Sequence, residues 1–156
     1  MSAQTLPSGA TAQEENPQWT VPSGWEPGPS SSVRRGSWTV KGPDGQSADV
    51  AVTAFPGDVG GLLANLNRWR AQIGVPPVTA DQVASITSNI DVSGTSATVV
   101  DFTADKPAQG KTQPQRMVVV TLSHAGNSWF FKMTGDAPLI ETQKDTLLQF
   151  VKSVKF

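Results

Sequence analysis

Alternation of polar and apolar side chains marks the first folded part of the chain. It runs through residues 37–40 and again through residues 48–55. One face of the second segment carries Val50, Val52 and Ala54, and the other carries Asp49, Ala51, Thr53 and Phe55. A period of two residues is typical of a strand whose two faces meet different surroundings. The Gly- and Pro-containing loop at 41–45 lies between the segments, so an antiparallel hairpin is predicted.

A helical period follows the hairpin. Its apolar positions fall at i, i+4, i+7 and i+11, and they are Leu62, Leu66, Trp69 and Ile73. This stripe predicts a helix with Asp58 as its N-cap and Gly74 just past its end. Residues 79–82, Thr-Ala-Asp-Gln, match a capping box and predict the start of a shorter second helix.

The second half of the chain is rich in short apolar segments. Strands are expected at 90–92, 97–103, 117–122 and 129–133, and one short extended segment is expected earlier, at 19–25. A last helix is predicted to start at Asp136, and its buried stripe is Ile140, Leu147, Val151 and Val154. The pattern therefore predicts an α+β fold: an antiparallel sheet of about six to seven strands with helices on both faces.

Composition narrows the classes of function. The 156 residues include no Cys, one His and a net charge of −1. Thiolate metal sites and cysteine chemistry are excluded, and no nucleic-acid partner is expected without a basic excess. Up to Asp105 there are five Lys and Arg against ten Asp and Glu, and beyond it seven against three. No cofactor and no metal site are expected, because no ligand motif is present; Asp101 and Asp105 lack the calcium-loop pattern.

Residues 1–17 differ from the rest of the chain. They contain a single Leu among Ser, Thr, Gln, Gly, Glu and Pro, which predicts a flexible polar tether before a single domain at 18–156. The segment lacks the charged start and apolar core of a signal peptide. We interpret it as the segment that follows an export signal or a lipid-anchor cysteine. This hypothesis predicts an exported protein, periplasmic or membrane-anchored, whose contact with a membrane is only through an anchor absent from this chain.

Three segments resemble a known superfamily. They are the opening V21-P-S-G-W25, the hairpin through Phe55, and the ending from Leu148 to Phe156. Together they resemble the photosystem II extrinsic protein PsbP and the Ran-interacting Mog family. More closely, the segment from Phe55 to Gly74 and the segment W129-F-F-K-M-T-G135 resemble uncharacterised exported bacterial proteins, many of them lipoproteins. The resemblance implies an α/β/α sandwich and an accessory or binding role, and it implies no reaction.

Candidate binding residues cluster around the first helix. Gly60 and Gly61 are costly in a helical turn; either the helix end packs closely on a strand, or the bare amides form an anion site. Asn65, Asn67, Arg68 and Arg70 follow on the same helix. Either Arg68 or Arg70 pairs with a carboxylate such as Asp49 or caps carbonyls, or these side chains form a polar recognition face.

Two further residues complete the candidates. Trp25 follows a turn and is expected either to close one end of the sheet or to anchor an interface. His124 is the single imidazole; it is expected near a turn, and no nucleophile elbow accompanies it.

The preferred functional hypothesis is a non-enzymatic envelope accessory or binding domain that contacts another envelope protein. The alternative is a small-molecule or anion-binding enzyme that uses Arg68, Asn67 and the glycine turn, with His124 as a base. A cytoplasmic adaptor is a third possibility, which suits the Mog branch but not the tether.

Overall fold

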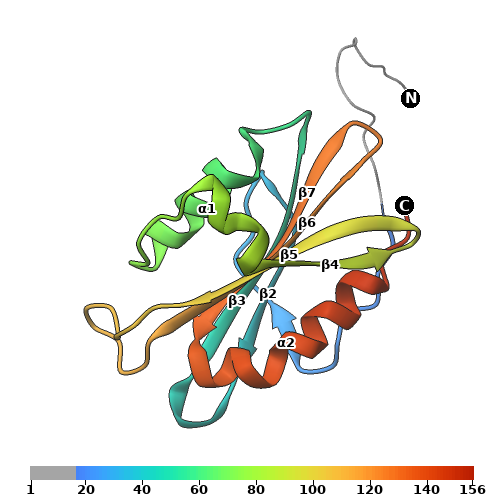
Figure 1. Ribbon diagram of the computed structural model, residues 1–156. Coiled ribbons are helices and arrows are strands. Elements are labelled where there is room, and N and C mark those ends of the chain that lie inside the picture. The colour runs from blue at the N-terminus through green and yellow to red at the C-terminus, as the bar shows by residue number, and fades with distance from the viewer. Residues whose placement is uncertain (1–16) are drawn as a thin grey trace.

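The computed structural model describes residues 17–156, and the predicted tether up to residue 16 lies outside the described residues. Seven strands form one twisted sheet (Figure 1) in the order β1-β2-β3-β7-β6-β5-β4. Every neighbouring pair is antiparallel. The strands are β1 (Trp25–Pro27), β2 (Arg34–Lys41), β3 (Ser47–Pro56), β4 (Thr87–Val92), β5 (Thr95–Thr103), β6 (Gln115–His124) and β7 (Asn127–Asp136). The predicted α+β class and the antiparallel sheet are confirmed.

The two α-helices and η2 occupy the predicted places in the chain, whereas η1 lies in a predicted loop and the N-cap of α1 is Gly60 rather than Asp58. Among the described residues they are α1 (Gly61–Gln72), α2 (Ala137–Lys152) and two 3-10 helices, η1 (Pro43–Gly45) and η2 (Ala80–Ile86). After α1, the backbone turns at Gly74, where φ is +77°, and the N–H of Val75 donates to the carbonyl of Arg70. Such a left-handed residue satisfies the last carbonyls of a helix. The capping box before η2 is present, with Thr79 N–H donating to Gln82 Oε1.

One prediction at the start of the domain is wrong. The first strand begins at Trp25 rather than at Trp19, after the Ser23-Gly24 turn. Before that turn, the described residues form a single isolated bridge, between Gln18 and Lys155. Pro22 lies within the predicted segment, and a residue without an N–H cannot pair fully in a sheet.

The buried hydrophobic residues divide into two clusters. The α2 cluster joins Ile140, Leu147, Phe150, Val151 and Val154 to strand residues that include Val50, Val52, Val118, Val120, Trp129, Phe131 and Met133. The α1 cluster joins Leu66 and Trp69 to Val100, Phe102, Met117, Val119 and Phe130. Alternate residues of β6 and β7 enter different clusters, as expected of successive strand side chains. The predicted stripe of the last helix is fully buried, which confirms its role as a packing face.

Three tryptophans surround Phe150 in the α2 cluster. Trp19, Trp25 and Trp38 lie with their ring centroids 5.6, 5.1 and 5.3 Å from that of Phe150. The indole N–H of Trp25 also donates to Gln143 Oε1 of α2. These rings join the N-terminal strand to the last helix, so residues 125 positions apart in the chain stabilise each other.

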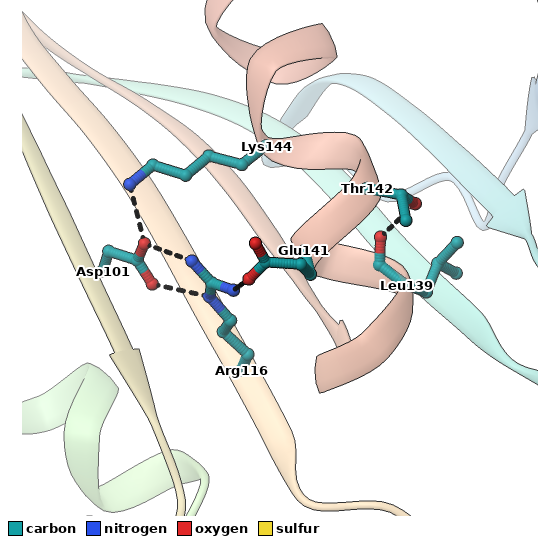
Figure 2. A network of polar contacts seen from close by, with 6 residues as sticks. All are labelled: Asp101, Arg116, Leu139, Glu141, Thr142 and Lys144. Atoms are coloured by element: carbon teal, nitrogen blue, oxygen red, sulfur yellow. Dashed lines mark hydrogen bonds and ion pairs between the residues drawn. The ribbon is translucent and has the colours of Figure 1, made fainter.

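A polar network joins α2 to the strands. Asp101 of β5 accepts bonds from both Nε and Nη2 of Arg116 on β6, at 2.9 and 2.7 Å, and from Lys144 Nζ at 2.8 Å. Arg116 also donates to Glu141 Oε1 at 2.6 Å. Figure 2 shows the Arg116 guanidinium between the two carboxylates, with Lys144 reaching Asp101 from the helix. We call these four residues the Asp101 network.

Candidate binding site

A pocket of about 380 Å³ lies where α1 meets β2, β3 and β7. It is lined by Val33, Arg34, Ala51, Thr53, Phe55, Val59, Arg68, Trp69, Phe130 and Lys132. This volume falls in the range of small-molecule sites, about 300–1,000 Å³. Three of the ten side chains are cationic and none is acidic. We refer to it as the cationic pocket.

Strand register explains why these residues meet. Lys132 of β7 lies opposite Ala51 of β3, and Phe130 lies opposite Thr53. Thr53 in turn faces Arg34 on β2, across a register shift between Arg34 and Gly36. Residues two apart on a strand share a face, so these pairs form two adjacent rows on one surface of the sheet. Leu66 and Trp69 of α1 pack on this surface together with Phe130, which places the helix at the border of the pocket.

The three cations are not equally neutralised. Arg34 forms a paired contact with Asp49, Nη1 to Oδ1 and Nη2 to Oδ2, both at 3.0 Å. Arg68, in contrast, donates to the side-chain carbonyl of Asn65. Lys132 Nζ donates to Gln72 Oε1 at 3.0 Å. Two positive charges of the pocket therefore have neutral amides as their hydrogen-bond partners.

Lys132 is held in a position that disfavours its charge. Desolvation lowers the pKa of its ammonium group below the ordinary value of 10.5. Asp49 opposes this shift, and the charges of Arg34 and Arg68 add to it. The three cations therefore act on one another, and an anion between them would relieve their repulsion.

Aromatic rings supply the apolar walls. Trp69 packs edge-on against Phe130, with centroids 5.6 Å apart, and Phe55 lies 6.3 Å from Phe130. Phe55 and Val59 are half-buried, and Val33 is 53% exposed. A ligand in the pocket would cover these partly exposed side chains, and such burial is favourable. The arrangement suits a molecule with an anionic group and an apolar body.

The two candidate glycines do not line this pocket. Gly60 and Gly61 both have left-handed backbones, with φ of +96° and +83°. A Cβ at either position would meet nothing within 4 Å, so the expectation of close packing against a strand is wrong. Their backbone conformation is the reason for glycine here. The amide of Gly61 donates to the carboxylate of Asp58 at 3.0 Å, so an internal anion already occupies that donor.

The remaining α1 candidates divide between structure and site. Arg68 lines the cationic pocket, whereas buried Asn65 holds Arg68 and lines a smaller neighbouring hollow of about 100 Å³ with Gly61. Asn67 accepts from the N–H of Val78 and donates to its carbonyl, at 2.8 and 2.9 Å. Arg70 donates to the carbonyl of Pro76. Neither arginine of α1 pairs with Asp49, which is bound by Arg34.

Trp25 and His124 lie away from the pocket. Trp25 is 8% exposed and packs in the α2 cluster. Such burial agrees with the expectation that it closes one end of the sheet, rather than with an exposed interface anchor. His124 is half-buried beside the β6–β7 turn, and its ring stacks on Phe156 with centroids 4.1 Å apart. His124 is not among the residues that line the cationic pocket, so Arg68 and this imidazole do not meet there.

Within residues 17–156, no group of three or more His, Cys, Asp or Glu side chains is arranged to hold a metal ion. The Asp101 carboxylate, one of two acids considered for calcium, is bound by Arg116 and Lys144. None of the helices in this described part is both long and apolar enough to cross a membrane.

Sequence reasoning missed Arg34 and Lys132. Lys132 stands between Phe131 and Met133, which are both fully buried, so alternation places it on the opposite face together with Phe130. The signal in the sequence is the position of Lys132 itself, a cation in the middle of an apolar strand. Arg34 was missed because the predicted strand began only at residue 37.

The chain matches no protein-family model and no curated protein. It is similar in structure to a protein of Bacteroides thetaiotaomicron, with 11% identity and a TM-score of 0.52 over 89% of this chain. The match covers 44% of that protein, so this chain spans less than half its length. A Pseudomonas aeruginosa protein of unknown function matches over 97% of this chain and 88% of its own, at 9% identity and a TM-score of 0.46. At 11% identity, the likeness to the Bacteroides protein concerns the fold alone.

Proposed function

We propose that this chain is a non-enzymatic binding domain of the cell envelope, which contacts another envelope component through the cationic pocket. The observation that carries this proposal is the convergence of Arg34, Arg68 and Lys132 on a partly exposed apolar pocket with one nearby carboxylate, Asp49. Of the two cations that have no carboxylate partner, Lys132 is half-buried and Arg68 is exposed. A partly buried charge that lacks an internal counterpart costs stability, and such charges are typical of sites that bind a ligand.

The placement of the helices on the sheet is also part of the proposal. We infer that α1 and α2 cover opposite faces of the sheet, so that the domain is an α/β/α sandwich of the PsbP/Mog-like kind. The division of successive β6 residues between the two clusters supports this inference: Val118 and Val120 lie with α2, and Met117 and Val119 lie with α1. The sequence resemblance at residues 21–25, in the hairpin at 37–55 and at 148–156 supports it independently.

Location is proposed from the sequence. The polar segment up to residue 17 and the resemblance to exported bacterial proteins favour an envelope protein held by an N-terminal anchor. Binding is proposed over catalysis because the enzymatic alternative requires His124 as a base beside Arg68. His124 stacks on Phe156 instead, outside the pocket that Arg68 lines.

The proposal is tested on the natively expressed protein. Cells are fractionated, and the chain is purified from the envelope under mild conditions, with bound components identified by mass spectrometry. We expect an envelope component that is retained by the wild type and by Lys152→Gln, and lost from the double variant Arg68→Gln/Lys132→Met. Lys152 lies in the last turn of α2, so Lys152→Gln removes one positive charge from another part of the domain, whereas the double variant removes two from the pocket. Recovery only from the cytoplasm, or equal retention by the double variant, would contradict the proposal.

A further inference from the structure

The cationic pocket has two chemically different parts. Arg68 and Lys132 supply hydrogen-bond donors, and both have neutral partners, Asn65 and Gln72. The rings of Phe55, Trp69 and Phe130 supply an apolar wall. A guanidinium group offers two parallel donors to a carboxylate, and an ammonium group adds a compact charge beside it.

Charge count favours an anion over a neutral ligand. Arg34, Arg68 and Lys132 carry three positive charges, and the contact of Asp49 with Arg34 removes one, which leaves an excess of two. Because the pocket is partly enclosed by apolar groups, water screens this excess less than it would on an open surface. A bound anion would gain from the positive charges of Arg68 and Lys132, whose hydrogen-bond partners are neutral.

Size and shape then limit the ligand. About 380 Å³ accommodates a phenyl ring or a short acyl chain together with its charged head, but not a folded domain. Phe55, Val59 and Val33 are the partly exposed side chains that such a body would cover.

We propose that the pocket binds a carboxylate attached to a compact apolar body, with Arg68 and Lys132 holding the carboxylate and Phe55, Trp69 and Phe130 contacting the body. The inference rests on the proposed function and names the chemistry of its ligand. Two sources share this chemistry: a free aryl or acyl acid, and the terminal carboxylate of a partner polypeptide that ends in an apolar residue.

The test uses 3-phenylpropionate as the probe, titrated into the full chain and followed by amide chemical shifts. We expect saturable shifts at α1, β3 and β7 with a Kd of about 1 mM or tighter. Two control compounds separate the contributions. The neutral 3-phenylpropionamide lacks the carboxylate charge, and acetate lacks the apolar ring. Each should bind at least about tenfold more weakly.

Single variants test whether Arg68 and Lys132 each bind the carboxylate. Arg68→Gln and Lys132→Met should each weaken 3-phenylpropionate about tenfold or more, with chemical shifts elsewhere in the domain unchanged. Arg70→Gln is the matched control on the same helix, because Arg70 contacts Pro76 and Phe102 and does not line the pocket. It should leave the Kd within about twofold. Equal binding of acid and amide, or unchanged binding in both pocket variants, would overturn the proposal.

The two proposals can fail separately. If 3-phenylpropionate does not bind, but an envelope component is retained in an Arg68- and Lys132-dependent way, the carboxylate inference is wrong and the proposed function stands. If the probe binds and dipeptides ending in phenylalanine bind about tenfold more tightly, the polypeptide source is favoured. The reverse order favours a free acid.

Discussion

The Asp101 network and the cationic pocket use the same kinds of side chain in opposite ways. In the network, Arg116 and Lys144 meet Asp101 and Glu141, so two positive charges face two negative ones. In the pocket, Arg34 pairs with the carboxylate of Asp49, whereas Arg68 and Lys132 donate to neutral amides. Both regions lie against the sheet, and both are partly shielded from water.

The pKa shifts report the same contrast. Burial raises the pKa of Asp101, but the hydrogen bonds and charges of Arg116 and Lys144 outweigh it, and the net pKa is lowered. For Lys132, desolvation is the largest effect, and its pKa falls despite Asp49. The network therefore stabilises its own charges, whereas the pocket leaves a charge that a ligand can stabilise. Charge balance separates a structural ion cluster from a candidate binding site.

Breaking the network should cause the largest loss of stability. Asp101→Ala leaves Lys144 without its partner and Arg116 with Glu141 alone, so we expect unfolding to become easier by about 2–4 kcal/mol. Urea unfolding measures this, and binding of 3-phenylpropionate by the folded variant should be unchanged. A loss below about 0.5 kcal/mol would show that the network is no more than a surface contact.

Acid should weaken the same region. Because the pKa of Asp101 is lower in the folded chain than its ordinary value of 3.8, its contribution is present above that value and is lost as pH falls through the folded pKa. Asp101→Asn should therefore show a flatter dependence of stability on pH below about 4 than the wild type does. Parallel curves for the two proteins would contradict the assignment.

Neighbouring residues of α1 sharpen the comparison. Asn67→Ala removes both hydrogen bonds to the backbone of Val78, so it should cost about 1–3 kcal/mol of stability and leave binding intact. Arg68→Gln should instead leave stability within about 0.5 kcal/mol of the wild type and weaken binding of 3-phenylpropionate about tenfold or more. Thermal unfolding and the probe titration, run on both variants, decide between these roles. The contrast fails if both variants change the same quantity.

Replacing the desolvated lysine should stabilise the domain while it removes binding. Lys132→Met places an apolar side chain where a charge is disfavoured, so we expect a higher Tm at neutral pH. The unfolded wild type binds more protons than the folded one between the lowered pKa and 10.5, so wild-type stability should rise with pH there. Lys132→Met should lack that rise. A lower Tm for this variant would mean that Lys132 serves the fold.

The smallest effect is expected at Glu141. Its carboxylate is 75% exposed, although it contacts Arg116 at 2.6 Å. Exposed ion pairs contribute little, so Glu141→Gln should change stability by less than about 1 kcal/mol. Urea unfolding measures the change. A larger loss of stability would mean that Glu141, like Asp101, is a main contributor to the network.

The elements of the fold were predictable because their signals are local. The stripe from Leu62 to Ile73 predicted α1, and the stripe from Ile140 to Val154 predicted α2. Alternation at residues 48–55 predicted β3 and its two faces. A helix or strand repeats within a few residues, so the pattern of side chains records it directly. The first strand was misplaced where prolines and turn residues interrupt that pattern.

The candidate site was predicted only in part. Arg68 was identified as a cation on the surface of α1, and the structure places it in the pocket. Gly61, Asn67, Arg70 and Trp25 are candidates whose contacts serve the fold, and Gly60 is required by its left-handed backbone. Nothing in a residue's type distinguishes an arginine that holds a loop from one that faces a pocket.

The sequence by itself determined the two main helices, most of the strands and the buried face of each, because these patterns repeat within a few residues. Only the tertiary structure decided that Arg34, Arg68 and Lys132 meet, because their strands and helix are far apart in the chain and adjacent through β3–β7 pairing. Asp49 likewise pairs with Arg34 rather than with α1 through the register of β2 on β3. The physical reason is that charge balance depends on distances in space, and sequence spacing fixes such distances only within one element.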